Sequence, residues 1–286
     1  MNPEPALMNR IAISFITLVL LLFAACDIIE APYMTDREVD NGDTTEVVRK
    51  VLLEEFTGHQ CPNCPEGTKI AEELKAYYGD QLIIMSIHAG WFARPLGDTF
   101  SKDFRTEEGE ELNDFFGCIN YPIGMVNRTD YENQRLLTPS AWGSAVASIT
   151  ELPPAFAMDL DLDYSPVNAI LEISVDVTSL INCINEYHLS VFIIEDGIIS
   201  PQRTNNPDYP TGIIEDYEHN HMLRKSVNGA WGDVLIDDHF AFGDTFSKQY
   251  QLTLDPEWVP ENCSVIAFVY RTDNLEIHQV EITPLF

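Results

Sequence analysis

Hydrophobic and polar residues follow two different patterns along the chain. In the first part, short continuous apolar runs at 51–53 and 82–87 are separated by stretches in which apolar residues recur at helical spacing. After Pro153-Pro154, apolar and polar residues alternate one by one, which is typical of strands with one buried face. This change predicts a boundary between an α/β region at 47–152 and an all-β region at 153–286.

The α/β region is predicted to form a sheet with helices on its faces. One helical stretch follows the 51–53 run, others span 99–116 and 139–152, and a further apolar strand follows Pro122. In the β region, the alternation predicts about seven strands in about 130 residues, which fits a sandwich of immunoglobulin-like size. The clearest strands lie at 156–164, 171–177, 189–194, 250–254, 265–270 and 275–282.

The N-terminal segment predicts export and a lipid anchor. Residues 11–25 are continuously apolar and follow Arg10, a length that suits a signal peptide (1–25) better than a membrane span. The segment ends in Phe23-Ala-Ala-Cys26, which resembles a bacterial lipobox and thereby implies a diacylated Cys26 at the mature N-terminus. The alternative is a plain secretory signal with a free Cys26. Residues 26–46 are acidic and polar and are predicted to form a flexible tether.

Charge limits the partners that this surface can bind. The chain has 46 acidic and 16 basic residues, a formal net charge of −30. Such a surface repels nucleic acid and anionic lipid headgroups, so we expect no nucleic-acid partner. Solubility is the simplest role of this charge, since the sequence contains no calcium-binding loop of the Asp-x-Asp-x-Asp-Gly type.

The candidate chemistry lies in Cys61-Pro-Asn-Cys64, directly after the first strand and before a helical stretch. Free N–H groups and the dipole at a helix N-terminus lower the pKa of a thiol placed there. Cys61 would then attack a substrate disulfide and Cys64 would resolve the mixed disulfide, with no cofactor. The motif could instead be a permanent structural disulfide or half of a zinc site. Zinc would need a second pair of ligands, and the nearby His59 and His88 do not form one.

This segment resembles the thioredoxin family, through Cys61-Pro-Asn-Cys64 and the strand before it. The resemblance implies that Glu55, six residues before Cys61, assists proton transfer at Cys64. It also implies that Pro122, which leads into a short apolar strand, is the cis-proline opposite the dithiol. Gln60 stands where thioredoxins have tryptophan, and this departure concerns substrate handling and redox potential rather than the fold.

The other cysteines and two histidines are further candidates. Cys118 is either a third redox cysteine or a small buried thiol, and burial is the favoured interpretation. Cys183 and Cys263 are the remaining pair and are a candidate structural disulfide in an oxidising compartment. His219 and His221, two apart on a predicted strand, would share a face. They lack a clear third ligand, so we predict no metal site.

The whole layout resembles the Bacteroidetes outer-membrane lipoproteins of the family named for a twenty-eight-kilodalton outer membrane protein. The resemblance rests on the Cys61–Cys64 segment, on Tyr121-Pro122 with Val126-Asn-Arg128, and on the 217–224 stretch. It implies a thioredoxin-like fold in a cell-envelope protein that is anchored to the outer membrane through its N-terminal lipid.

Two functional hypotheses follow from these patterns. In the first, the protein is a thiol–disulfide oxidoreductase that acts on thiols or disulfides of envelope proteins, with Pro122 shaping the substrate groove. In the second, it is a non-catalytic surface or adhesion lipoprotein that binds its partner through the β-sandwich. Cys61–Cys64 would then be a permanent disulfide in a scaffold.

Overall fold

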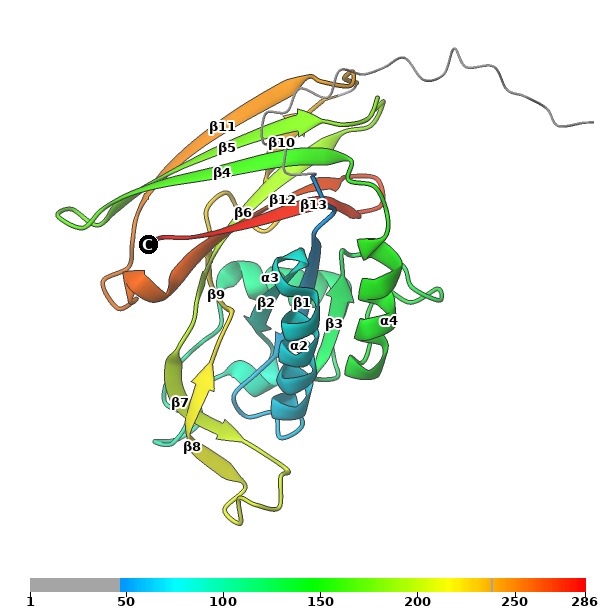
Figure 1. Cartoon of the computed structure of the whole chain (residues 1–286). Coiled ribbons are helices and arrows are strands. Elements are labelled where there is room, and N and C mark those ends of the chain that lie inside the picture. The colour runs from blue at the N-terminus through cyan, green and yellow to red at the C-terminus, as the bar shows by residue number, and fades with distance from the viewer. Residues whose placement is uncertain (1–46, 238) are drawn as a thin grey trace, which may run out of the picture. The chain divides into compact units, whose positions relative to one another are not determined.

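The computed structural model describes residues 47–237 and 239–286, and Figure 1 shows how their elements are arranged. The predicted signal peptide, the tether and Cys26 lie outside the described residues. The helices are α2 (Cys64–Tyr78), α3 (Glu107–Phe116) and α4 (Pro139–Thr150), with short 3-10 helices at Gly79–Gln81, Trp91–Ala93 and Pro260–Asn262. The strands are β1 (Val51–Thr57), β2 (Leu82–His88), β3 (Ile123–Val126), β4 (Phe156–Ser165), β5 (Ile170–Ser179), β6 (Tyr187–Glu195), β7 (Ile198–Arg203), β8 (Ile213–His219), β9 (Met222–Ser226), β10 (Asp233–Ile236), β11 (Thr245–Thr253), β12 (Cys263–Arg271) and β13 (Ile277–Pro284).

The first three strands form the part of the sheet that carries the Cys61–Cys64 motif. β1 and β2 are parallel and joined through α2, whereas β3 runs antiparallel to β1. Leu53 on one face of β1 packs with Trp142 of α4, and Phe56 on the other face packs with Leu112 of α3. Both faces are covered, and this explains why these strands are continuous apolar runs rather than alternating ones.

The sheet does not stop at the predicted boundary, Pro153-Pro154. Its strand order is β13-β12-β6-β9-β2-β1-β3, with β10 also paired to β6. β9 joins β2 where Met222 pairs with Ser86. One hydrophobic core also spans the boundary, with Phe56 and Phe268 among its members. The regions 47–152 and 153–286 therefore share a sheet and a core within one compact unit.

A second, three-stranded sheet packs on part of this long sheet. Its strand order is β11-β5-β4, and it lies across β6, β12 and β13 (Figure 1). Alternation in β5 points Leu171, Ile173 and Val175 into the core between the two layers. Two packed β layers agree with the alternating pattern. They do not form a free-standing immunoglobulin-like sandwich, however, because one layer continues into the α/β sheet.

A buried ion pair helps to hold the shared sheet together. Arg128, after β3, donates two hydrogen bonds of 2.7 and 2.8 Å to the carboxylate of Glu54 in β1, and both side chains are fully buried. The Arg128 guanidinium also lies 5.1 Å from the ring centroid of Phe268 and 5.5 Å from that of Tyr270, both in β12. Arg128 therefore links the first strand of the described chain to one of its last.

Candidate functional site

The Cys61–Cys64 motif lies between the end of β1 and the first turn of α2, as the sequence predicts. Cys61 and Cys64 form a disulfide, with their Cα atoms 5.4 Å apart, and α2 begins at Cys64. The turn before the motif requires glycine, since a Cβ atom at Gly58 would lie 2.5 Å from the backbone carbon of Phe92. This close approach packs the turn against the loop that follows β2.

Both cysteines are buried, and the β7–β8 hairpin covers them. Cys61 and Cys64 are each 1% exposed. The Gln202 side chain donates a hydrogen bond of 2.9 Å to the Cys61 carbonyl, and the Arg203 amide donates one of 2.8 Å to the His59 carbonyl. Figure 1 shows the β7–β8 hairpin beside the motif end of α2. The sequence patterns did not predict this hairpin, and therefore did not predict that the two cysteines would be covered.

Glu55 lies in the buried interior behind the motif. Its side chain is fully buried and accepts hydrogen bonds from the Thr68 hydroxyl at 3.0 Å and the Ser86 hydroxyl at 3.3 Å. Burial raises the pKa of Glu55 to about 7, against the smaller lowering by these two hydroxyls. Thr68 and Ser86 also line the small cavity that Cys64 lines. The hydroxyls of Thr68 and Ser86 therefore link the Glu55 carboxylate to the cavity that Cys64 lines.

Pro122 lies against the first turn of α2, and its peptide bond with Tyr121 is cis. A Cβ atom added at Gly67 would lie 2.6 Å from the Pro122 ring and 3.4 Å from the Glu55 carboxylate. Gly67 therefore lets the proline and the buried acid approach the same turn. The structure brings together the four residues that the sequence singled out: Glu55, Cys61, Cys64 and Pro122.

Sequence reasoning missed a cluster of buried histidines next to the motif. The ring centroids of His59, His88 and His219 lie 5.4, 5.5 and 5.5 Å from that of Phe104. Each ring has at least one buried nitrogen without a hydrogen-bond partner among the described residues. Burial lowers the pKa of all three, that of His219 to about 4, so the rings are neutral at neutral pH. No local sequence pattern predicts this cluster, because its members come from three separate segments.

His219 and His221 do not share a face. β8 ends at His219, which packs against His88, with ring centroids 5.3 Å apart. His221 has a positive φ of 56° and instead contacts Glu72 at 3.1 Å and Asp196 at 3.3 Å. Among the described residues, no group of three or more His, Cys, Asp or Glu side chains is placed to hold a metal ion.

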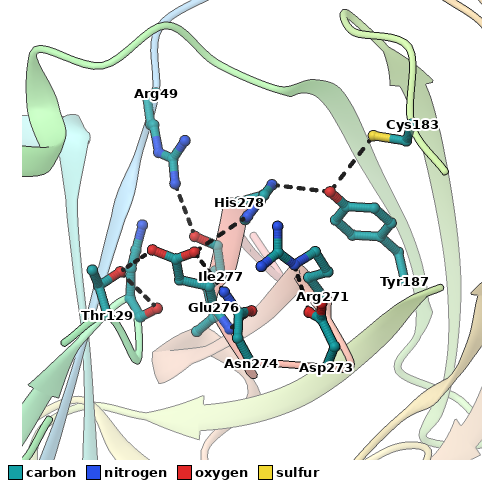
Figure 2. Close-up of polar contacts among 11 residues, drawn as sticks. Arg49, Thr129, Cys183, Tyr187, Arg271, Asp273, Asn274, Glu276, Ile277 and His278 are labelled. Atoms are coloured by element: carbon teal, nitrogen blue, oxygen red, sulfur yellow. Dashed lines mark hydrogen bonds and ion pairs between the residues drawn. The ribbon is translucent and has the colours of Figure 1, made fainter. Parts of the chain in front are cut away.

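Cys183 and Cys263 lie at opposite ends of β6 and are both free thiols. Cys263 is paired with Glu195, whereas Cys183 precedes Tyr187 at the other end of the strand. The nine residues of β6 span about 30 Å, and a disulfide allows about 7 Å between Cα atoms. Cys183 donates a hydrogen bond to the Tyr187 hydroxyl at 3.5 Å, beside His278 (Figure 2). The structure therefore does not contain the predicted Cys183–Cys263 disulfide.

Cys118 is a buried free thiol, 4% exposed. Burial, with a smaller effect of Glu54, raises the pKa of this thiol to about 12. A thiol with such a pKa forms almost no thiolate at neutral pH, which makes it a poor nucleophile. The geometry fits the buried-thiol interpretation of Cys118.

A family model described as outer membrane protein Omp28 matches residues 110–284, more than half of the chain. The chain belongs to the Omp28 family. The matched span begins within α3 and ends with β13, so it starts after Cys61-Pro-Asn-Cys64. Membership of the Omp28 family places the protein at the outer membrane, which confirms the predicted location. No helix among the described residues is both long enough and apolar enough to cross a membrane.

Solved structures also resemble this Omp28-family chain. HBP35 of Porphyromonas gingivalis matches with a TM-score of 0.64 and 18% identity, over 84% of this chain and 76% of that chain. An X-ray structure of a protein from Agrobacterium tumefaciens matches with a TM-score of 0.51 and 11% identity, over 84% of this chain and 96% of that chain. The chain thus shares with HBP35 a fold that is mostly β-sheet with few helices.

A domain of the outer membrane lipoprotein Omp28 from Porphyromonas gingivalis matches with a TM-score of 0.31 and 21% identity, over 46% of this chain and 87% of that chain. Among curated proteins, none matches this Omp28-family chain.

Proposed function

We propose that this Omp28-family protein is an envelope thiol–disulfide oxidoreductase that uses Cys61 and Cys64. One observation carries the proposal: the disulfide lies at the start of α2 with the ionisable carboxyl of Glu55 buried behind it. A disulfide that serves only stability needs neither a helix N-terminus nor a buried acid. The strand, helix and parallel strand around the motif support a thioredoxin-like interpretation of this region.

In this proposal the oxidised protein accepts two electrons from a substrate dithiol. A substrate thiolate attacks the sulfur of Cys61, which forms a mixed disulfide and releases Cys64 as a thiolate. The second substrate thiolate then attacks the substrate sulfur of the mixed disulfide. The substrate disulfide closes, Cys61 leaves as a thiolate, and the two protein thiolates take up the two protons that the substrate lost. The same steps in reverse reduce a substrate disulfide.

Glu55 is the proton partner of Cys64 in this scheme. With a pKa of about 7, its carboxyl is half protonated at neutral pH, so it can both donate and accept a proton there. The hydroxyls of Thr68 and Ser86 connect the carboxylate to the cavity that Cys64 lines. The α2 N-terminus would stabilise the Cys61 thiolate.

A non-catalytic surface protein is the second candidate. The observation that favours it is the exposure of only 1% at both cysteines beneath the β7–β8 hairpin. The family match also starts after the motif, at residue 110. In this case Cys61–Cys64 is a permanent disulfide, and the two packed β layers carry the partner surface.

The reduction potential of the Cys61–Cys64 pair distinguishes the two candidates. Glutathione would be titrated into a soluble form of the protein that begins at Thr45. The oxidation state of Cys118, Cys183 and Cys263 would be followed separately by mass. A value of about −270 to −120 mV is expected for an exchange-competent pair, and a value below about −300 mV would identify a structural bridge. In the same experiment, Cys64→Ala should trap mixed disulfides through Cys61, and the absence of any such adduct would count against the oxidoreductase.

A further inference from the structure

We propose that a cleft beside Cys61 binds the carboxylates that flank the cysteines of acidic polypeptide substrates. The cleft has a volume of about 520 Å³ and lies between the loop after β2 and the end of β7. We call it the arginine cleft; the residues that matter here are Gln60, Pro62, Trp91, Arg94 and Arg203. Its link to disulfide exchange rests on the proposed function, whereas the binding itself can be tested alone.

Positive charge without a carboxylate partner marks the arginine cleft. Most arginines among the described residues form ion pairs with carboxylates, namely Arg105, Arg128, Arg135, Arg224 and Arg271. The guanidinium groups of Arg94 and Arg203 form neither an ion pair nor a hydrogen bond with another described residue, and both line this cleft. No described Asp or Glu lines it, although the chain has 46 acidic residues.

Aromatic rings hold these two arginines without neutralising them. The Arg94 guanidinium carbon lies 3.1 Å from the ring centroid of Trp91, and that of Arg203 lies 5.2 Å from the ring centroid of Phe100. Stacking orients a guanidinium and leaves its edge N–H groups free for an anion. The Nε atom of Arg94 is buried without a partner, and Trp91 is 65% exposed. An exposed tryptophan with a stacked, unpaired arginine has the composition of a binding site.

The chemistry of the arginine cleft selects carboxylates. Guanidinium groups bind carboxylates through paired, charge-assisted hydrogen bonds. Gln60 and Pro62 line the cleft on either side of Cys61 in the sequence, so an acidic segment bound there holds its neighbouring sulfur next to the motif. The net charge of −30 repels the same segment from the rest of the surface, and this favours one orientation. The substrate class is therefore polypeptides with Asp or Glu beside the reacting cysteine.

Binding is measured first, without exchange. Three fluorescent peptides with an internal disulfide, identical except for two Asp, two Ser or two Lys flanking the cysteines, are titrated against the oxidised full-length chain in a neutral detergent. We expect the Asp peptide to bind at least about tenfold more tightly than the Ser peptide, the gain that one good charged contact provides. Arg94→Gln/Arg203→Gln should remove that difference. Equal affinity for the three peptides, or an affinity that this variant leaves unchanged, would overturn the proposal.

A matched control removes the same charge elsewhere. Lys225 on β9 and Lys248 on β11 do not line the arginine cleft, so Lys225→Gln/Lys248→Gln should retain the preference for the Asp peptide. If this control variant also lost the preference for the Asp peptide, the preference would be an effect of net charge. That result would overturn the arginine cleft as a binding site.

Exchange rates then separate this proposal from the function on which it builds. The reduced peptides are offered to the oxidised protein, and closure of their disulfides is followed. Faster closure for the Asp peptide supports both ideas. Equal rates for all three peptides would overturn the selection of substrates by the arginine cleft and keep the oxidoreductase. Arginine-dependent binding of the Asp peptide without any closure would support the cleft and contradict the oxidoreductase.

Discussion

Glu54 and Glu55 show how burial and partners give neighbouring acids different chemistry. Both are fully buried in β1, but they alternate between its two faces. Glu54 forms an ion pair with Arg128 on one side of the strand. On the other side, the Glu55 side chain accepts hydrogen bonds from two hydroxyl groups. Desolvation therefore dominates at Glu55 and raises its pKa to about 7. The same residue type is a structural anchor at one position and a candidate proton donor at the next.

Glu55→Gln should make the protein more stable, increasingly so as the pH rises. The folded-state pKa of about 7 lies above the ordinary value of 4.5, so the folded chain binds more protons than the unfolded chain between these values. Stability falls as the pH rises through that window, and at pH 8 the cost is about 3 kcal/mol. Glutamine does not ionise. Urea unfolding at pH 5 and pH 8 should show a difference between Glu55→Gln and the natural protein that grows toward pH 8.

The exposed Glu66 supplies the control for this prediction. Its side chain is 73% exposed, so Glu66→Gln removes one surface charge and should keep the loss of stability toward pH 8 that ionisation of Glu55 causes. A stability difference for Glu55→Gln that stays constant between pH 5 and pH 8 would show that the Glu55 carboxyl does not titrate in this window.

Among the described secondary-structure elements, the β7–β8 hairpin is the one that covers the motif. Residues 202–205 of this hairpin bond to the turn at 58–63 through both backbone and side-chain groups, including Asn205 N–H to Pro62 O at 2.9 Å. These are local contacts that can break while β1 and α2 remain intact. We therefore predict that a reagent reaches the Cys61–Cys64 disulfide only when these contacts open.

Gln202→Ala should speed the reduction of Cys61–Cys64. The Gln202 amide bonds to the carbonyls of Cys61 and Gly58, at 2.9 and 3.4 Å, and its loss weakens the cover. Loss of about 1.4 kcal/mol corresponds to a rate about tenfold higher, if opening limits reduction. Reaction with a small dithiol, followed by mass after alkylation, measures the rate. Lys225→Gln serves as the control, and an unchanged rate in Gln202→Ala would mean that the hairpin does not limit access.

At the scale of the whole molecule, one sheet and one core join the two predicted regions. The long sheet runs from β13 to β3, and the Arg128 guanidinium that pairs with Glu54 of β1 lies beside the Phe268 ring of β12. Stability is therefore a property of the whole described unit rather than of either region. A defect at this junction should lower the free energy of unfolding of both regions together.

Arg128→Met should lower the free energy of unfolding by about 3 to 5 kcal/mol, since it leaves the Glu54 charge buried without its partner. The double variant Glu54→Leu/Arg128→Met should recover much of this loss, because no buried charge remains. The more exposed Arg135, paired with Asp130, is the control, and Arg135→Met should cost at most about 1 kcal/mol. Urea unfolding gives all three values. Equal losses in Arg128→Met and Arg135→Met would show that the buried pair has no special role.

Attachment to the membrane tests the predicted lipid anchor. Cys26→Ala should shift the protein from the membrane fraction to the soluble fraction, since its acyl chains would be lost. Radiolabelled palmitate should label the natural chain and not this variant. Continued sedimentation of Cys26→Ala with membranes would assign the attachment to another part of the protein.

Residue order along the chain was enough to predict the features that depend on local structure. Continuous apolar runs, alternation and turn residues predicted most strands and the helix after Cys64, because these patterns reflect which faces of an element are covered. The resemblance to the thioredoxin family also singled out Glu55, Cys61, Cys64 and Pro122, which the structure brings together. The layout placed the protein in the family and at the membrane that the family match supports.

The surroundings of that motif became known from the three-dimensional fold. The cover over Cys61 depends on Gln202, 141 residues away, and the histidine cluster and the arginine cleft likewise join distant segments. The same holds for the separation of Cys183 from Cys263 and for the sheet that crosses Pro153. Local patterns indicate whether a residue is buried, whereas these features depend on which residues, distant in the sequence, cover it.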